Sequence, residues 1–394
     1  MSQTSPVLER AGSADGAAKP RLHLKYVDGL RAFAAIYVVL GHAWLQTWPQ
    51  PTQRPEGWQL HLTSWLNYGI FAVVFFIAIS GFCLMLPVLA NEGTFGSRGA
   101  SGFFIRRARR ILPPYYMALL LSIILVATCL NRVTHSIFDV SLPMTKAGIV
   151  SHLLLIHNLN DKTANNINLP LWSIAVECQI YLLFPILVVI RKRFGMSAVL
   201  AGTYLLSIAI QSYVQNTSYW GLKPLFLFVF ALGMYAAEVV ALAGPQRRGF
   251  IWIGCFSAAL MFALFQRDSL TRLGLTEIVV GIVAMCLLIV CAQWPGNLIG
   301  RLASSAIISK IGTFSYSLYL VHFPVQQLIW LYLVQPLHLG KFTTFLLMAT
   351  VGTTLIVLFA FVFYLVFERP FCGSDSVRLS AAAKLEVGRQ VVIP

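Results

Sequence analysis

The stretch that decides the fold is LWSIAVECQIYLLFP, residues 171–185. Fourteen of its fifteen residues suit a helix that is buried in protein or faces lipid, and Glu177 is the exception. A carboxylate at membrane depth is costly unless it is paired, protonated or in contact with water. The stretch therefore predicts a membrane-spanning helix that carries a functional carboxylate.

Composition extends this prediction to the whole chain. Of the 394 residues, 58% are hydrophobic and only 11% are charged, and the mean hydropathy is +0.74. Soluble chains carry about 25% charged residues. Apolar runs long enough to cross a membrane, about 20 helical residues, recur along the sequence, so we predict an all-α polytopic membrane protein. The ten predicted spans are residues 31–48, 67–90, 111–130, 172–190, 197–214, 224–242, 249–265, 275–293, 311–334 and 342–367.

The positive charges orient these spans. Segments on the side of the N-terminus hold 21 of the 29 Lys and Arg residues. Because cytoplasmic loops of membrane proteins carry the excess of Lys and Arg, both termini are predicted to be cytoplasmic. The formal net charge of +15 is therefore mainly a topology signal. We expect no nucleic-acid partner, because the basic residues are scattered over short loops.

Neither a disulfide nor a metal site is predicted. The seven cysteines lie in predicted spans or in the C-terminal tail, and none forms a CxxC pair. The eight histidines show no HExxH or similar metal-binding spacing.

The chain is predicted to hold one membrane domain, residues 25–370. Residues 1–24 are rich in Ala, Gly and Ser and are predicted to be a disordered cytoplasmic tail. Residues 371–394 are predicted to be a cytoplasmic tail, and at this length we expect no appended soluble domain in it. A signal peptide is disfavoured for the first span, because no clear small-x-small cleavage site follows it. The longest outer segment, 131–171, is either a recognition element or a solvated loop.

The first functional candidate is His42, in DGLRAFAAIYVVLGHAW, residues 28–44. It follows Arg31 by eleven residues, or about 16 Å of helix, and so reaches the interior of the membrane. Glu177 enters from the opposite side, and depth counting puts it about 8 Å below the outer surface. We therefore expect Glu177 to meet His42 and to orient its imidazole as in a catalytic dyad. The alternative is a structural pair that only locks two helices.

The second candidate is the arginine group of FFIRRARRILPPYY, residues 103–116. Arg107 and Arg110 are three residues apart and share one face of a helix, which suits the binding of phosphates. The alternative is that these arginines only set topology and contact anionic lipid. Pro113 and Pro114 fall in the first turn of the span predicted to follow.

Smaller signals complete the set. In SYSLYLVHFP, residues 315–324, three polar residues are candidates for oxyanion or acceptor contacts, namely Tyr316, Ser317 and His322. Ser80 and Gly81 lie in the second span, where the glycine permits close helix approach. Each of these, taken alone, is also consistent with packing.

Taken together, these stretches resemble the acyltransferase-3 family of integral membrane acyltransferases. The resemblance covers residues 24–370 and rests on the order and spacing of DGLRAFAAIYVVLGHA, SGF, RRARRILPPY, WSIAVECQIYLLFP and SYSLYLVH. It implies that Arg31, His42, Arg107, Arg110 and Glu177 occupy the family's motif positions. One departure is that many relatives carry a second acidic residue where this chain has Cys178.

The resemblance implies transfer of an acyl group, most often acetyl, from cytoplasmic acyl-CoA to a hydroxyl of an extracytoplasmic glycan or related acceptor. Acyl-CoA is then a substrate, no tightly bound cofactor is expected, and the location is the cell (inner) membrane. His42 and Glu177 would be catalytic, whereas Arg31, Arg107 and Arg110 would bind acyl-CoA. Two other hypotheses stay open, a proton-coupled transporter or flippase that uses the intramembrane His and Glu residues, and a non-catalytic scaffold.

Overall fold

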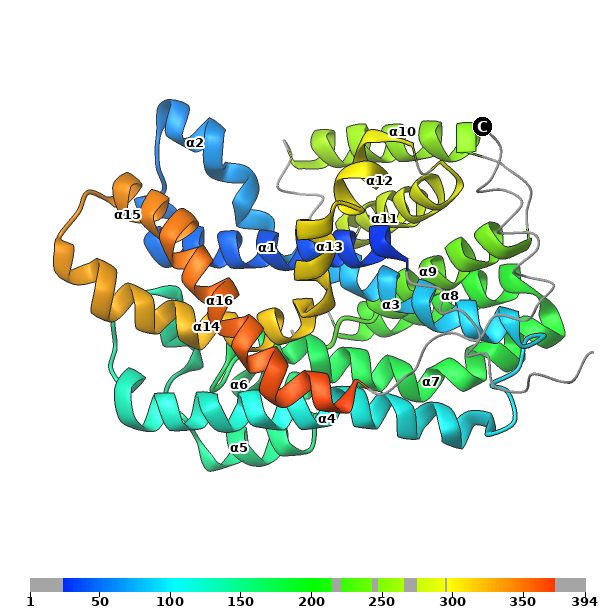
Figure 1. Ribbon diagram of the computed structural model, residues 1–394, viewed down its shortest axis with the longest axis horizontal. Coiled ribbons are helices and arrows are strands. Elements are labelled where there is room, and N and C mark those ends of the chain that lie inside the picture. Colours follow the sequence, from blue (N-terminus) through cyan, green and yellow to red (C-terminus); the bar gives the residue numbers. More distant parts are fainter. Residues whose placement is uncertain (1–23, 215–220, 243–246, 266–274, 295, 373–394) are drawn as a thin grey trace, which may run out of the picture.

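The computed structural model describes residues 24–214, 221–242, 247–265, 275–294 and 296–372. The predicted tails, 1–24 and 371–394, lie almost entirely outside these ranges. Figure 1 shows an all-helical molecule whose longest helices run along its long axis. The helices are α1 (Lys25–Thr47), α2 (Gly57–Thr63), α3 (Ile70–Ala90), α4 (Gly99–Leu125), α5 (Lys146–Leu153), α6 (Asp161–Ala164), α7 (Trp172–Phe194), α8 (Met196–Val214), α9 (Leu225–Leu242), α10 (Arg247–Phe265), α11 (Leu275–Gln293), α12 (Leu298–Ala303), α13 (Ala306–Thr313), α14 (Ser315–Ile329), α15 (Lys341–Leu347) and α16 (Thr353–Phe363).

Short turns of other helix types extend or join these helices. The five-residue π-helical turns are η3 (Val126–Leu130), η8 (Trp330–Val334), η10 (Met348–Gly352) and η11 (Tyr364–Glu368). The 3-10 turns are η1 (Pro51–Gln53), η2 (Ser64–Tyr68), η4 (Ile137–Ser141), η5 (His157–Leu159), η6 (Leu169–Leu171), η9 (Gln335–Leu337) and η12 (Arg369–Phe371). Within the described ranges there is no β-strand.

The fold class predicted from composition is confirmed. Eight helical segments of the described chain are long and apolar enough to cross a membrane, and they correspond to eight of the ten predicted spans. The other two predicted spans are also helical. They are α1, whose polar residues include Arg31 and His42, and α10, whose apolar part is the shorter stretch Gly249–Leu260.

Helix α4 begins earlier than the sequence suggested. It starts at Gly99, so the four arginines of RRARR are helical, and Pro113 and Pro114 lie in the middle of the helix instead of its first turn. Proline is costly inside a helix because it lacks the N–H that bonds to the carbonyl four residues before. In a membrane bundle that cost is tolerated where neighbouring groups satisfy the freed carbonyls.

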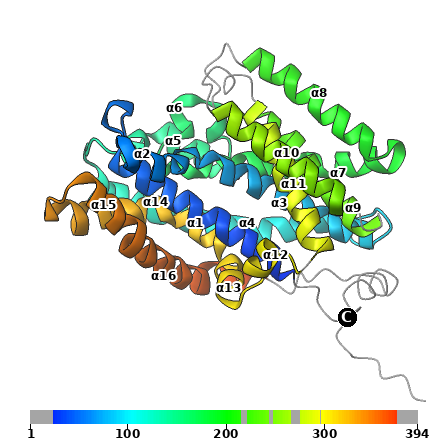
Figure 2. The same ribbon diagram turned by 90° about the horizontal axis from the view of Figure 1, so that it is seen from above.

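The core of the bundle is formed by α1, α3, α4, α7, α9, α11 and α14. Helices α3 and α9 approach so closely that a Cβ at Gly81 would overlap the carbonyl of Phe230, and a Cβ at Gly233 would overlap that of Ala78. The role predicted for Gly81 is therefore confirmed, and Gly233 supplies the matching gap. Helices α8 and α16 lie on opposite flanks (Figure 2).

The outer segment 131–171 is not a solvated loop. It folds back along α4, where the Tyr115 hydroxyl donates to the carbonyl of His152 at 2.9 Å and the Tyr116 hydroxyl donates to that of Leu153 at 2.9 Å. Eight of its polar residues, among them His152 and Asn168, are buried, whereas several of its apolar residues, among them Val150 and Leu154, are exposed. The segment is therefore part of the folded bundle.

Candidate active site

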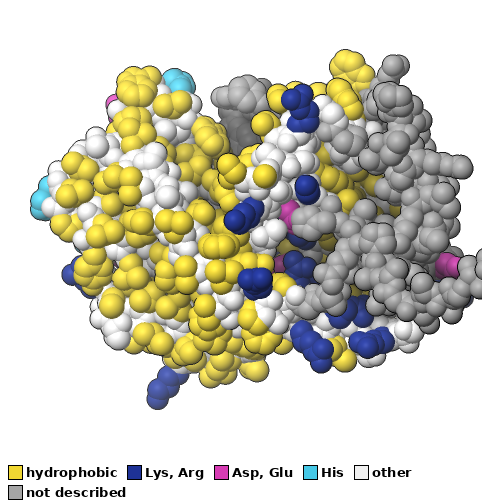
Figure 3. Space-filling view, viewed as in Figure 1, with side chains coloured by type: hydrophobic (Ala, Val, Ile, Leu, Met, Phe, Trp, Pro, Cys, Tyr) yellow, Lys and Arg dark blue, Asp and Glu magenta, His cyan; other side chains and the backbone are white. Residues whose placement is uncertain are grey.

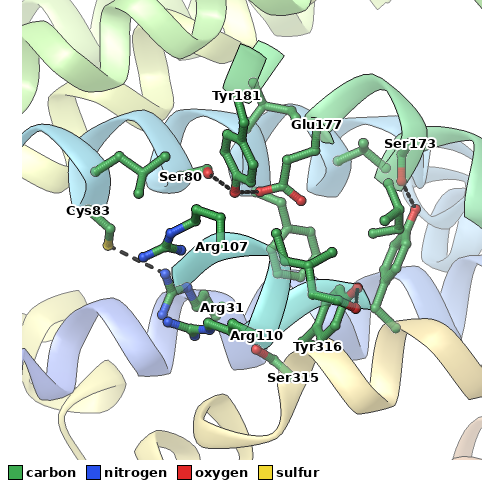
Figure 4. Close-up of a pocket in the computed structure, with 17 residues that line it drawn as sticks. Arg31, Ser80, Cys83, Arg107, Arg110, Ser173, Glu177, Tyr181, Ser315 and Tyr316 are labelled. Carbon is green, nitrogen blue, oxygen red and sulfur yellow. Dashed lines mark hydrogen bonds between the residues drawn. The ribbon is translucent and has the colours of Figure 1, made fainter. Parts of the chain in front are cut away.

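A pocket opens among α1, α3, α4, α7 and α14, and it encloses about 820 Å³ of empty space including its mouth. Its lining is unusual for the interior of a membrane bundle because it contains four ionisable residues, together with tyrosines and serines (Figure 4). The charged members are Arg31, Arg107, Arg110 and Glu177. Four of the five residues that the sequence motifs singled out thus meet in one cavity.

The three arginines reach the pocket from two helices and lie together on one side of it (Figure 4). Arg31 is on α1, where its guanidinium donates to Cys83 Sγ at 3.4 Å and lies 3.5 Å from Asp28 Oδ1. Arg107 and Arg110 project from the same face of α4, which confirms the prediction that they share a helix face. No described residue forms a hydrogen bond or ion pair with the guanidinium of Arg107 or of Arg110. A partly buried charge without a partner is costly, so this wall is suited to an anion.

Glu177 lies on α7 across from the arginines and is held by a chain of hydroxyl groups. The Tyr181 phenol donates to Glu177 Oε1, and Ser80 Oγ lies 2.6 Å from the same phenol oxygen. Since the single phenol proton is directed to the carboxylate, Ser80 donates to Tyr181. The sequence reading missed Tyr181, although its position one helical turn after Glu177 was a usable signal.

The opposite wall is formed by tyrosines of α14. Tyr319 Oη lies 2.7 Å from Ser173 Oγ, and both hydroxyls lie 3.1 Å from the carbonyl oxygen of Pro170. Tyr316 also lines the pocket, but its hydroxyl donates to the carbonyl of Ile111 at 3.1 Å. These bonds fix both rings.

His42 and His322 lie next to the pocket, behind Tyr319, and neither histidine lines it. The ring of Tyr319 is 5.7 Å from that of His322, and His42 Nδ1 lies 2.9 Å from His322 Nε2. His322 Nδ1 lies 2.7 Å from the carbonyl oxygen of Tyr319. A carbonyl can only accept, so in neutral His322 the proton is on Nδ1, and Nε2 accepts from His42 Nδ1–H. In this tautomer Nε2 of His42 carries the free lone pair, so it can accept a proton.

The structure corrects the expected pairing of Glu177 with His42. In the described part of the chain no hydrogen bond or ion pair joins the two, and Glu177 shares a pocket with Arg31, eleven residues before His42. Depth counting failed because it placed the start of α7 at the membrane surface. Ile167, Asn168, Pro170 and Leu171 are instead buried in the bundle.

Asn168 binds the segment that precedes α7 to α14. Its side chain donates to the carbonyl of Leu320 on α14 at 3.1 Å, and this carbonyl is free because Pro324, four residues later, has no N–H. The sequence shows that Pro324 leaves this carbonyl without its helical partner, but it does not show that Asn168 donates to it.

Contrary to the sequence prediction, Ser317 is not placed to contact an oxyanion in the pocket. Both its backbone N–H, at 3.1 Å, and its hydroxyl donate to Glu368 Oε2, and Ser317 does not line the pocket. Glu368 is buried at the end of the last span. The serine therefore joins α14 to the end of that span, and its proton is already engaged.

As for metals, the described residues contain no group of three or more His, Cys, Asp and Glu side chains that could hold an ion.

The chain is similar in sequence to known membrane proteins. The model of an acyltransferase domain, that of the acyltransferase-3 family, matches residues 24–365. A Staphylococcus aureus (strain COL) protein, provisionally named an O-acetyltransferase, is 24% identical over 382 residues, covering 90% of this chain and 58% of the relative. The peptidoglycan O-acetyltransferase OatA of Listeria monocytogenes is 23% identical over 340 residues, covering 77% of this chain and 50% of the relative.

The chain thus spans about half to three fifths of the length of these curated relatives. No solved structure matches it. The family match covers all the residues of the pocket and the histidine pair, and it confirms the resemblance seen in the sequence motifs. The chain belongs to the acyltransferase-3 family of membrane proteins.

Proposed function

We propose that this protein is a membrane O-acetyltransferase that moves an acyl group from cytoplasmic acyl-CoA, with acetyl-CoA as donor, to a hydroxyl of an extracytoplasmic glycan. The observation that carries the proposal is a pocket with two unpaired guanidinium groups that ends beside a hydrogen-bonded histidine pair. Such a pocket suits a donor with an anionic end and a reactive end. The protein then acts in the cytoplasmic (inner) membrane.

The arginine wall supports a phosphorylated donor. Coenzyme A carries several phosphate groups, and planar guanidinium groups bind phosphates in a bidentate manner. Arg107 and Arg110 would contact the phosphates directly, with Arg31 beside them. The aromatic end at Tyr319 would then receive the pantetheine arm and its thioester.

The tautomer of His42 supports its role as general base. The acceptor hydroxyl attacks the thioester carbonyl carbon while His42 Nε2 takes the hydroxyl proton. The carbon–sulfur bond breaks, and the leaving thiolate takes that proton from His42, so that the products are an O-acyl ester and free CoA thiol. His322 fixes the tautomer of His42 and stabilises the imidazolium form, which is the role that the sequence predicts for Glu177.

The acceptor class is supported by the names of relatives. OatA of Listeria monocytogenes is named a peptidoglycan O-acetyltransferase, and the Bacillus subtilis protein YrhL, 24% identical over 341 residues, is provisionally named as one. A glycan hydroxyl is therefore the acceptor that we propose for this chain.

The test combines donor binding with product analysis in cells. Arg107→Ala/Arg110→Ala should weaken binding of CoA to the purified protein at least tenfold, because both unpaired cations are removed. Arg109→Ala is the matched control, since Arg109 is exposed on α4 and does not line the pocket. His42→Ala should leave CoA binding unchanged and abolish base-labile acyl esters on envelope and secreted glycans, measured by NMR before and after mild base. A wild-type protein that binds no CoA would contradict the proposal and favour a transporter or scaffold.

A further inference from the structure

We propose that Gln326 binds the acceptor, by bonding its carboxamide to hydroxyl groups of a sugar held beside His42. The inference rests on the proposed transferase function and names a residue that neither the sequence motifs nor the pocket includes. The side-chain amide of Gln326 makes no hydrogen bond within the described part of the chain.

Gln326 lies on α14 and is only 1% exposed. Neither its Oε1 nor its Nε2 has a hydrogen-bond partner among the described residues. Burying an amide without hydrogen-bond partners is costly, so such groups in native proteins usually have a bound water, an ion or a functional partner. This amide is therefore arranged for a group that the chain itself does not supply.

Gln326 lies close to the histidine pair along α14. It follows His322 by four residues, so it lies on the same face of α14, about 6 Å further along the helix axis. The helix runs from the pocket at Ser315 and Tyr316 towards Leu337, and Gln326 therefore lies on the side of His322 away from the arginines. A donor in the pocket and an acceptor at Gln326 would approach His42 from opposite directions.

The neighbouring amides show that this side of the histidines is polar. Gln46, one turn after His42 on α1, donates to Gln327 Oε1. Gln327 Nε2 donates in turn to Thr134 Oγ1 at 3.1 Å, and that hydroxyl donates to Asp139 Oδ1 at 3.0 Å. Thr134 and Asp139 are only half-buried, so polar groups continue from the histidines towards the surface of segment 131–171.

The contrast between the two adjacent glutamines identifies which one is free for a ligand. Gln327 uses both atoms of its amide within the protein and is fixed by them. Gln326 uses neither. A carboxamide offers one acceptor and two donor hydrogens, which can bond two hydroxyls of one sugar ring at once and leave a third directed at His42 Nε2.

The experiment replaces Gln326 with methionine, which has a similar length and no hydrogen-bonding amide. Because no protein hydrogen bond is lost, the melting temperature of the purified protein should be unchanged or higher. CoA binding should also be unchanged, whereas ester-linked acyl groups on the cell's own envelope glycans should fall at least tenfold. Gln327→Met is the matched control and should lower the melting temperature, because it breaks bonds to Gln46 and Thr134.

Three results would overturn the assignment of Gln326. Unchanged glycan acylation in Gln326→Met would mean that the amide holds only a water molecule. Loss of CoA binding would move its role to the donor pocket, and a lower melting temperature would make it a structural residue. A wild-type strain without glycan esters would remove the proposed function itself and this subsite with it, so the two failures are distinguishable.

Discussion

The sequence identifies Glu177 as a functional residue, but only the structure identifies its hydrogen-bond partner. Its presence in an apolar stretch marked it as functional, and the structure places it in the same pocket as three arginines. Its partner could not be read from the sequence, because the partner depends on how deeply α7 begins. In the structure that partner is Tyr181, which is itself bonded to Ser80.

Tyr181→Phe tests the importance of this hydroxyl chain. A hydrogen bond to a charged group contributes about 1.5–3 kcal/mol, so we expect acyl transfer to fall roughly ten- to a hundredfold as the carboxylate loses its position. The rate of CoA release from acetyl-CoA by purified protein would be measured. Tyr204→Phe on the partly exposed face of α8 is the control. Equal rates for wild type and Tyr181→Phe would show that Glu177 needs no such support.

At the scale of helices, two glycines determine how closely α3 and α9 pack. Lipid gives no hydrophobic drive for helix association, so membrane helices rely on close backbone contact at small residues. Gly81 and Gly233 provide such contact from both sides. This packing carries Ser80 and Cys83 of α3 into the pocket, and it therefore influences the site as well as stability.

Gly233→Leu should destabilise the protein, because its side chain would overlap the backbone of Ala78 and Phe82. Overpacking in a well-packed core costs about 1–3 kcal/mol, and the melting temperature in detergent should fall accordingly. Gly202→Ala on α8 is the matched control, since nothing lies within 4 Å of its Cβ position. It should be neutral or stabilising by up to about 1 kcal/mol. A melting temperature unaffected by Gly233→Leu would mean that α3 and α9 are further apart.

At the scale of the whole molecule, the charge distribution predicts the orientation in the membrane. On the face seen in Figure 3, apolar side chains cover the half that contains α15, whereas most Lys and Arg side chains lie towards the other half. This asymmetry agrees with the excess of basic residues predicted inside. It would give the donor pocket access from the cytoplasm.

Orientation can be tested with two thiols at opposite ends of the last span. Cys372 is exposed at the end predicted to be cytoplasmic, and His338 is exposed in the connection predicted to be outside. A membrane-impermeant maleimide should label Cys372 only in inside-out vesicles, and His338→Cys (in a Cys372→Ala background) only in right-side-out vesicles. Mass spectrometry would identify the labelled peptides. The reverse pattern would invert the topology and the proposed direction of transfer.

The sequence by itself determined the fold class, the helical stretches, the common face of Arg107 and Arg110, and the set of ionisable residues in the membrane. These follow from local rules, because hydropathy, helical spacing and the cost of buried charge act on neighbours in the chain. Only the tertiary structure decided that His42 bonds to His322, that Glu177 bonds to Tyr181, and that Ser317 is engaged by Glu368. Those contacts depend on the relative depth of helices, which is set by the buried start of α7 and by Pro324, and no local pattern encodes that depth.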